Sequence, residues 1–317
     1  MSVMPGSRLR PGGWLPSFIL LSAIWGASFA FIKLAMDAGM APAWLAFWRC
    51  ALGAASLILI MAVRREPVPR DPRLWAHTAV VAIMLNTVPF MLIAWAEQHI
   101  SSVLTGVWNA TTPMFTLIFA VALLPDERAS RRRLLGLGMG FAGVLVVLGI
   151  WEGVRGDALM GSLATLAGTA CYGIGFAYTR RYLSGRTESG TVMSAMQIGW
   201  AAVQLALIAP VTAGAPAWPG LGPAAAILVL GAVSTGVAYI MNFRLIREAG
   251  PTIAATVTYV TPLWSTLIGV VFLSEPVGWN TVAGGVLVIA GVALARTAPS
   301  PGPRSPEAPP SRVPAKV

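Results

Sequence analysis

The amino-acid sequence predicts an all-α polytopic membrane protein of ten transmembrane helices, arranged as two inverted five-helix repeats. Three features predict this fold: the composition, the placement of basic residues and an internal repeat. Of the 317 residues, 56% are hydrophobic and 11% are charged, whereas soluble domains carry about 25% charged residues. The mean hydropathy is +0.73. This composition excludes a soluble enzyme, a disulfide scaffold and a disordered protein.

Ten apolar runs, each bounded by charged residues or by Pro and Gly, are long enough to cross a bilayer. About 20 residues are needed for a spanning helix. The runs are apolar all round instead of alternating, which favours helices over the strands of a membrane barrel. The predicted spans are 15–36, 42–63, 74–96, 101–123, 134–150, 158–179, 191–212, 223–243, 252–273 and 279–295.

Two terminal segments flank the spans. The first span follows Arg8 and Arg10 and contains the small-residue stretch GASFA, so a cleaved signal peptide is one alternative. A retained helix is preferred, because the span contains Lys33 and its sequence recurs later in the chain. Residues 1–14 are then a cytoplasmic segment. Residues 297–317 contain seven prolines and are predicted to be a disordered cytoplasmic tail.

Basic residues alternate across the predicted spans. Only Arg155 falls on the outer side, and Lys33 and Arg49 lie within spans. Cytoplasmic loops carry the excess of Lys and Arg, so both termini are predicted on the cytoplasmic side of a bacterial inner membrane. The net charge of +10 therefore reflects topology and indicates no nucleic-acid partner. The nineteen inner residues are Arg8, Arg10, Arg64, Arg65, Arg70, Arg73, Arg128, Arg131, Arg132, Arg133, Arg180, Arg181, Arg186, Arg244, Arg247, Arg296, Arg304, Arg312 and Lys316.

The chain contains an internal repeat of five spans. WGASFAFIK at 25–33 matches YGIGFAYTR at 172–180. The two copies are predicted at 15–150 and 158–296. Because five is odd, the second copy must insert upside down, and inverted repeats are the structural basis of alternating access. Further pairs at offsets of 148 or 149 residues are Pro113 with Pro262, Glu127 with Glu275, Gly136 with Gly284 and Gly143 with Gly291.

The same residues resemble the EamA-type permeases of the drug/metabolite transporter superfamily. The similarity lies in IWGASFAFIK, an Arg near the start of the second span, TTPMFT followed by ERAS, and GLGMGFAGVLVVLG. It covers residues 15–296. It implies a ten-helix permease, often an exporter, for amino acids, related metabolites or drugs, with a central cavity lined mainly by helices 1–4 and 6–9. The second copy departs from the pattern at Pro276, where a basic residue often follows the Glu.

The basic residues inside spans are candidates for gating and binding. A charge at a helix centre costs about 2.5–3.5 kcal/mol. Lys33 lies near the outer end of its span and is assigned to the gate, with pairing to Asp37 or snorkelling as the alternative. Arg49 lies about two turns inside the second span. It is predicted to face the cavity, where it closes the outer gate or holds a substrate carboxylate.

Aromatic and neutral polar residues recur near the predicted membrane middle. Many will simply pack or hydrogen-bond between helices, but aromatic faces with a few amides suit a small amphipathic or zwitterionic solute. The predicted substrate-binding residues are Trp25, Phe29, Arg49, Asn86, Trp95, Asn109, Thr112, Tyr172, Phe176, Tyr239, Tyr259 and Thr261.

Two prolines fall near the midpoints of predicted spans. Pro113 and Pro262 each free a backbone carbonyl one turn earlier. They are either tolerated packing kinks or hinges of the gate. No carboxylate lies near a helix midpoint, which favours facilitated passage or exchange, or a proton coupling relayed by terminal groups such as Glu97 and His99.

The sequence argues against an enzyme and predicts no cofactor or metal. His77 and His99 are about 33 Å apart along one helix, and Cys50 and Cys171 are lone thiols. The GxGxxG at 138–143 follows no strand, so it indicates helix packing and not a dinucleotide site. The expected partners are the lipid bilayer and a small-molecule substrate, and a homodimer is left open. The alternatives to a carrier are a channel-like facilitator and a non-transporting assembly or sensory protein.

Overall fold

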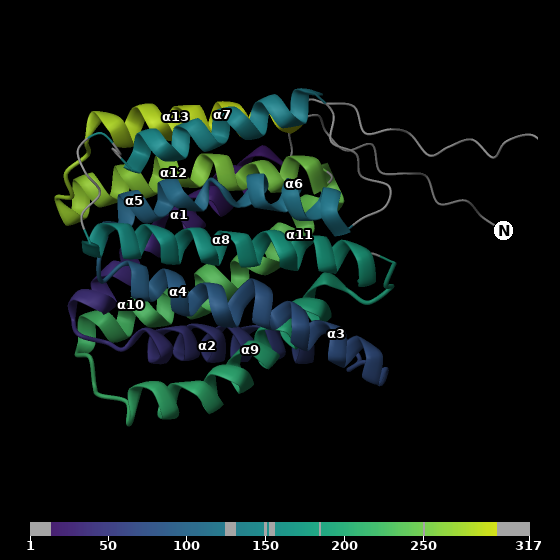
Figure 1. The fold of residues 1–317 in the computed structure, drawn as a ribbon. Coiled ribbons are helices and arrows are strands. Elements are labelled where there is room, and N and C mark those ends of the chain that lie inside the picture. The colour runs from purple at the N-terminus through teal and green to yellow at the C-terminus, as the bar shows by residue number, and fades with distance from the viewer. Residues whose placement is uncertain are drawn as a thin grey trace, which may run out of the picture.

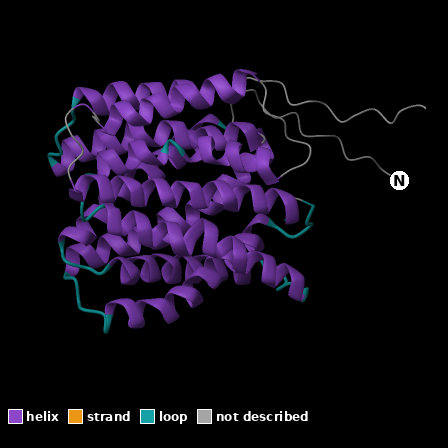
Figure 2. Ribbon diagram, in the orientation of Figure 1, coloured by secondary structure: helices purple, strands orange, loops and turns teal. Residues whose placement is uncertain are grey.

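The computed structural model describes residues 14–123, 131–148, 151, 156–183, 185–249 and 251–296, and no strand occurs among them. The helices lie side by side in one bundle (Figure 1), and Figure 2 shows only helices and loops. Their bounds are α1 Leu15–Asp37, α2 Pro42–Val63, α3 Pro72–Ala82, η1 Ile83–Thr87, α4 Val88–Ala96, α5 Ser102–Asn109, α6 Thr112–Leu123, α7 Arg131–Leu148, α8 Gly156–Tyr182, α9 Gly190–Ala213, α10 Leu221–Gly231, η3 Ala232–Val237, α11 Ala238–Ala249, α12 Pro251–Leu273 and α13 Trp279–Arg296.

Most of these helices have the length and composition of membrane spans. Among the described residues, seven helical segments are long and apolar enough to cross a bilayer: α1, α2, α3 to α4, α5 to α6, α8, α9 and α10 to α11. Three further apolar helices are shorter, at Leu134–Val147, Val260–Leu273 and Trp279–Gly291. The prediction of an all-α polytopic membrane protein is therefore confirmed, whereas the count of ten spans stays a prediction.

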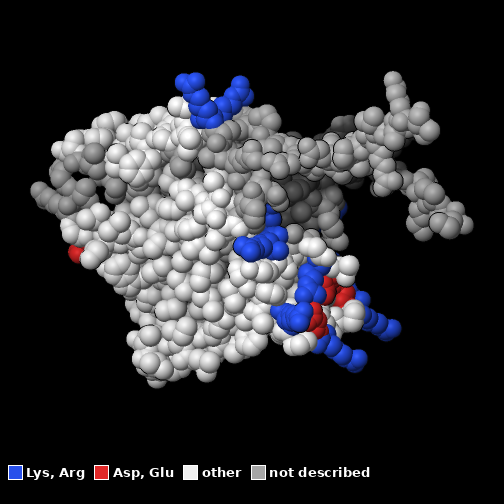
Figure 3. Space-filling view, turned by 45° about the vertical axis from the view of Figure 1, so that its right-hand side comes forward, with Lys and Arg blue, Asp and Glu red and all other residues white. Residues whose placement is uncertain are grey.

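The two ends of the bundle differ in charge. We call the end at which α1 begins the proximal end; it includes loops 64–71 and 183–189. The opposite end, with loops 38–41, 97–101, 214–220 and 274–278, is the distal end. Basic side chains gather at the proximal end, and the flank of the bundle in the same view is free of charge (Figure 3). An uncharged flank suits contact with lipid tails.

The two repeats pack against each other through equivalent contacts. Helix α1 packs against α12, and its counterpart α8 packs against α6. Both crossings are close because a glycine faces the neighbouring backbone. A Cβ atom at Gly26 would lie 2.9 Å from the carbonyl oxygen of Thr261, and one at Gly173 would lie 2.7 Å from the carbonyl carbon of Phe115. These glycines are the counterparts that the repeat predicts.

The pair α7 and α13 shows that the copies are inverted. A Cβ atom at Gly143 would lie 2.8 Å from the carbonyl oxygen of Gly284, and one at Gly291 would lie 2.6 Å from that of Gly136. Ascending residues of α7 thus meet descending residues of α13, so the two helices are antiparallel. Each contact is converted into the other when the copies are exchanged, as a two-fold relation requires. The glycines of the GxGxxG region include Gly140 and Gly143 in this packing, in agreement with their predicted role.

Both repeats contain a π-helical segment at the same place. The segments η1 and η3 begin 149 residues apart, at Ile83 and Ala232. A π-helix is rare, and its single extra residue often occurs at functional sites. The hydrophobic periodicity does not predict either segment, because each is shorter than two helical turns.

The copies differ at their prolines. In the second copy α12 runs through Pro262 without a break. In the first copy the helix stops at Asn109 and restarts at Thr112, so Pro113 is the second residue of α6. The apolar segment Ser102–Leu123 corresponds to the predicted span 101–123, and its helix is interrupted just before Pro113, where the sequence predicts a weak point. Thr111 stabilises the break, since its hydroxyl donates to the carbonyl of Trp108 at 2.7 Å.

Candidate functional site

Arg49 joins the second helix of the first repeat to the π-helix of the second repeat. Its Nε donates to Oγ1 of Thr235 at 3.1 Å, and this hydroxyl donates to the carbonyl of Leu230 at 3.0 Å. Helices α2 and η3 approach closely because Gly231 lies between them, where a Cβ atom would be 2.6 Å from that of Leu52. The guanidinium carbon lies 3.9 Å from the ring centroid of Phe90, a cation–π geometry.

The charge of Arg49 is buried, and no carboxylate among the described side chains forms an ion pair with it. The residue is 9% exposed, and the ion pairs of the described residues do not include it. Its guanidinium donates a hydrogen bond to a neutral hydroxyl. An uncompensated cation in a membrane interior is costly and is usually found facing a functional partner.

A second set of hydrogen bonds joins the second helix of the second repeat to the π-helix of the first repeat. Gln197 of α9 donates through Nε2 to Oδ1 of Asn86 in η1 at 2.6 Å, and Asn86 donates through Nδ2 to the hydroxyl of Tyr239 at 2.9 Å. The offset is 148 residues between Arg49 and Gln197, and 149 between Asn86 and Thr235. Each repeat therefore bonds its second helix to the π-helix of the other.

The amides of α9 are satisfied by this arrangement. Thr87 donates to Oε1 of Gln204 at 2.6 Å, and Gln204 donates through Nε2 to the carbonyl of Ala79 at 3.1 Å. Asn86 and Thr87 are both buried. The two glutamines within the predicted span 191–212 thus hold α9 against η1 and α3.

We define the inter-repeat polar cluster as Arg49, Asn86, Gln197, Thr235 and Tyr239. Aromatic side chains surround it. Phe90, Tyr172 and Tyr239 belong to one hydrophobic cluster. The ring of Trp25 packs edge-on against Tyr239 with centroids 6.5 Å apart. Phe29 is buried in an adjoining cluster that Tyr172 also contacts. A charge, amides and aromatic faces are therefore brought together between the repeats.

Half of the twelve predicted substrate-binding residues lie at this place, and five of the others are located elsewhere. Trp25, Phe29, Arg49, Asn86, Tyr172 and Tyr239 are in or beside the cluster. Trp95 and Phe176 are 38% and 45% exposed. Asn109 and Thr112 flank the break between α5 and α6, and Thr261 donates within its own helix to Val257 at 3.0 Å. The side chain of Tyr259 lies outside the described residues.

The predicted set omits Phe90, Gln197 and Thr235. Gln197 and Thr235 are polar residues within apolar spans. The repeat could have singled them out, because they are the counterparts of Arg49 and Asn86. Phe90 gives no signal of its own in the sequence, and only its equivalence to Tyr239 at an offset of 149 points to it.

Lys33 is held at the distal end. Its Nζ lies 3.0 Å from Oδ1 of Asp37 and donates to the backbone carbonyl of Glu97 at 2.9 Å. The expected pairing with Asp37 is therefore present. The second contact joins α1 to the end of α4, which a sequence pattern does not show.

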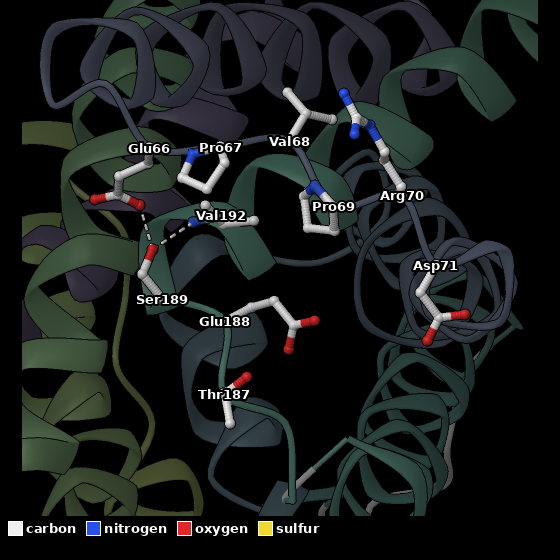
Figure 4. Close-up of a pocket in the computed structure, with 10 residues that line it drawn as sticks. All are labelled: Glu66, Pro67, Val68, Pro69, Arg70, Asp71, Thr187, Glu188, Ser189 and Val192. Carbon is white, nitrogen blue, oxygen red and sulfur yellow. Dashed lines mark hydrogen bonds between the residues drawn. The ribbon is translucent and has the colours of Figure 1, made fainter.

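Two hollows open at opposite ends. One, of about 430 Å³, lies at the proximal end between residues 66–71 and 187–192. Figure 4 shows Glu66 and Ser189 facing each other at its edge, with Asp71 on the far side. The other, of about 370 Å³, lies at the distal end beside residues 216–219. An offset of 149 converts 66–71 into 215–220, so the hollows occupy equivalent places in the two copies. No predicted site residue lines either one.

Polar contacts between the repeats surround the proximal hollow. Arg64 donates to the hydroxyl of Thr191 at 3.2 Å, and Glu66 accepts a hydrogen bond from Ser189. Arg186 and Asp71 form an ion pair at 2.7 Å. The hydrogen bond from the Arg186 guanidinium lowers the pKa of the Asp71 carboxyl below its ordinary value of 3.8. The proximal ends of the two copies are thus tied by charge.

The described residues offer no metal site, since no three His, Cys, Asp or Glu side chains are grouped so that they could hold an ion. His77 bonds to Tyr178 at 2.8 Å, whereas His99 lies in the distal loop. Cys50 and Cys171 are free thiols. The described side chains therefore bring together groups suited to binding a polar solute and not a known catalytic arrangement.

Comparison with known proteins finds transporters of similar sequence. The chain is 25% identical to an uncharacterized transporter of Archaeoglobus fulgidus over 284 residues, which cover 87% of this chain and 94% of the relative. It is 27% identical to the inner membrane transporter YedA of Escherichia coli K12, over 80% of this chain and 82% of that protein. It is 28% identical to the transporter YdeK of Bacillus subtilis, over 90% and 96%.

A solved structure described only as the crystal structure of a protein shares the fold. Its TM-score is 0.62 at 19% identity, over 90% of this chain and 98% of that chain. The model of the EamA-like transporter family matches residues 13–149 and again residues 159–297. The two matches fall on the two repeats. The chain belongs to the EamA-like transporter family, within the drug/metabolite transporter superfamily that its sequence resembles.

Proposed function

We propose that this membrane transporter carries a small organic solute with a carboxylate group, such as an amino acid or related metabolite. The observation that supports this proposal is Arg49. Its buried guanidinium has no carboxylate partner among the described side chains, and a carboxylate of the solute would supply one through bidentate hydrogen bonds. The amides of Asn86 and Gln197 and the rings of Trp25, Tyr172 and Tyr239 suit the rest of an amphipathic or zwitterionic solute.

The proposed mechanism is alternating access between the two repeats. The inter-repeat polar cluster lies where the second helix of each copy meets the third span of the other, so a change of angle between the copies acts on it directly. Equivalent contacts between the copies support such a movement. They are the antiparallel pair of α7 with α13, and the matching pairs of α1 with α12 and of α8 with α6. Lys33, Pro113 and Pro262 stay assigned to the gates. The proposed repeats are 15–150 and 158–296.

We further propose that the proximal end faces the cytoplasm of a bacterial inner membrane and that the direction is export. The excess of basic residues at the proximal end supports this orientation. Export rests on the habit of the family alone. The predicted absence of a cofactor and of enzymatic activity belongs to the same proposal.

Arg49→Gln tests the role of the charge. Glutamine can still donate to Thr235, as Gln197 does to Asn86, but it cannot compensate a carboxylate. Purified protein in proteoliposomes is screened with labelled amino acids and aromatic metabolites, with and without a pH gradient. For any solute that the wild type carries, we expect a fall of about tenfold or more in kcat/KM, since a charge-assisted hydrogen bond contributes about 1.5–3 kcal/mol.

Amide and ester analogues of the same solute are the matched control. They lack the carboxylate, so Arg49→Gln should change their transport little. Equal losses for acid and amide would contradict the assignment of Arg49 to the carboxylate. Saturable counterflow of labelled solute distinguishes a carrier from a channel-like facilitator, because only a carrier exchanges bound solute across the membrane.

A further inference from the structure

Glu97 is a buried carboxyl group at the distal end that the proposed site does not use. It caps the C-terminus of α4 and is completely buried. Neither of its carboxyl oxygens has a hydrogen-bond partner in the part of the chain that the structure describes. Buried charged groups are normally paired, so a carboxylate in this position would be strongly disfavoured.

The charged groups around Glu97 are engaged elsewhere. Those that act on its carboxyl are Lys33 and Asp37 of α1, Arg49 of α2 and Glu275 after α12. Lys33 bonds to Asp37 and to the backbone carbonyl of Glu97, not to its carboxyl. Arg49 donates to a hydroxyl of η3.

Glu275 is fully occupied as well. Its carboxylate accepts hydrogen bonds from the backbone N–H groups of Ser102 and Val103 at 2.8 Å and 3.0 Å, so it caps the N-terminus of α5. The nearby His99 places Nδ1 2.9 Å from the carbonyl of Trp95. Among the described residues, no cation therefore forms an ion pair or a hydrogen bond with the Glu97 carboxyl.

Two further influences act in the same direction. The C-terminus of a helix carries partial negative charge, which disfavours a carboxylate there. Burial raises the pKa of the Glu97 carboxyl well above its ordinary value, and the negative charge of Glu275 raises it further, against opposing effects of Lys33 and Arg49.

We propose that Glu97 is a proton-binding site that links closure of the distal end to the uptake of one proton. In the closed arrangement described here the carboxyl is neutral. When the distal end opens, water reaches it, the O–H bond breaks and the proton passes to water. The carboxylate that remains is hydrated or accepts a hydrogen bond from the ammonium group of Lys33. The opening step rests on the alternating access proposed above.

The direction of the pH dependence follows from the pKa of Glu97 in the closed and open states of the distal end. Glu97 has the higher pKa in the closed state, so protonation at a pH below that value favours closure. Raising the pH favours the open state, by at most about tenfold per pH unit for one proton. The effect ends below the pKa of the open state, where both states carry the proton.

Infrared difference spectroscopy tests whether Glu97 holds the proton. Full-length protein in nanodiscs should show the carbonyl stretch of a protonated carboxylic acid at about pH 7, well above the ordinary glutamate pKa of about 4.3. Glu97→Gln should remove this band, and Asp157→Asn, a change at an exposed distal position, should leave it. Persistence of the band in Glu97→Gln overturns the proposal, whatever solute is carried.

Thiol labelling tests the link to opening without any solute. Cys50 and Cys171 are replaced by Ala, and Ile100→Cys places a thiol at a buried distal position three residues after Glu97. The rate of labelling by a membrane-impermeant maleimide at this position is divided by the rate at the exposed control Gln98→Cys. The division removes the change in rate that arises because thiols ionise as the pH rises. The ratio should rise several-fold between about pH 6 and pH 8, within the limit for one proton.

In Glu97→Gln the same ratio should be low and independent of pH. A ratio that rises equally in wild type and variant overturns the link, as does a constant ratio in the wild type. If Glu97→Gln does not fold, Glu97→Met provides the same uncharged state. These measurements need no transported solute, so failure of the solute screen and failure of this inference are separate results.

Discussion

The two connections that join the repeats have the same geometry and different charge. In each, a residue of the second helix of one copy donates to a side chain in the π-helix of the other. One donor is the cation Arg49, bonded to Thr235, and the other is the neutral Gln197, bonded to Asn86. The duplicated backbone has therefore been kept while the chemistry has diverged. A symmetric scaffold thus places a single positive charge on one side of its own pseudo-two-fold axis.

The same contrast separates packing from function in this chain. Equivalent glycines are retained in both copies, because backbones approach equally closely at α1 with α12 and α8 with α6. The polar side chains of the two connections are not retained, since Arg49 and Thr235 stand where the other copy has Gln197 and Asn86. If packing is shared and chemistry is not, substitutions at equivalent glycines should cause equal losses of stability. Substitutions at Arg49 and at Gln197 should then affect transport unequally.

The largest expected effect is at the paired glycines. Gly26→Leu and Gly173→Leu should each destabilise the protein by about 1–3 kcal/mol or more, because overpacking forces the backbone apart. A Cβ atom at either position already meets backbone atoms of the facing helix within 3.0 Å. Thermal unfolding in detergent measures the loss. Gly138→Leu, where nothing lies within 4 Å, is the control.

Unequal losses would break the comparison. If only one of the two variants unfolds, the crossings of α1 with α12 and α8 with α6 are not equivalent, and the two-fold relation between the copies fails at this layer.

A smaller loss is expected in the neutral connection. Asn86→Leu leaves the amide of Gln197 and the hydroxyl of Tyr239 without their partner. Both side chains are only half-buried, so water replaces part of the lost bonding, and we expect a cost of about 1 kcal/mol. The double variant Asn86→Leu/Gln197→Leu should recover part of the melting temperature, since no amide is then left unpaired. A double variant less stable than Asn86→Leu alone would show that the connection is not a unit.

The smallest effect concerns the ion pair at the proximal end. Asp71 pairs with Arg186, whereas Gly220 stands at the equivalent distal position. The pKa of Asp71 is lowered in the folded protein, so its contribution is present above the unfolded pKa and is lost as the pH falls through the folded value. Asp71→Asn should lower the melting temperature slightly at about pH 7, and this difference should vanish only once the pH lies below the lowered pKa of the folded Asp71 carboxyl.

High salt provides the control for that pair. Exposed ion pairs contribute little to stability and are screened by ions, so the difference in melting temperature between wild type and Asp71→Asn should shrink as the salt concentration rises. A difference that is independent of both pH and salt would assign the effect to the Asp71 cap of α3 and not to Arg186.

Much of the fold was predictable from residue types alone. Apolar runs, the placement of arginines and the match of Gly26 with Gly173 suffice for an all-helical membrane protein with a duplicated unit. The two π-helices were not predictable, because each depends on one extra residue in a helical turn, and a hydrophobic pattern does not resolve so small a change. Pro113 and Pro262 each predict a weak point, but the residue types do not decide whether the helix is interrupted, as it is before Thr112, or continues, as it does through Pro262.

The candidate site was predictable in part, for a similar reason. Arg49 and Asn86 stand out because charge and amides are rare in apolar spans. Trp95 and Phe176 have the same composition signal, yet they are exposed. An aromatic residue in a membrane helix serves lipid contact as well as binding, and only the packing of the helices decides between them.

The paired π-helices carry information about ancestry. Each adds one residue to a helical turn, and a one-residue insertion at the same register in both copies is most simply explained by one event in a single gene of half this length. That ancestor then already possessed the underwound turn before duplication. Two of its products, inserted in opposite senses, would each have bonded through this turn to the second helix of the other, as the two copies now do within one chain.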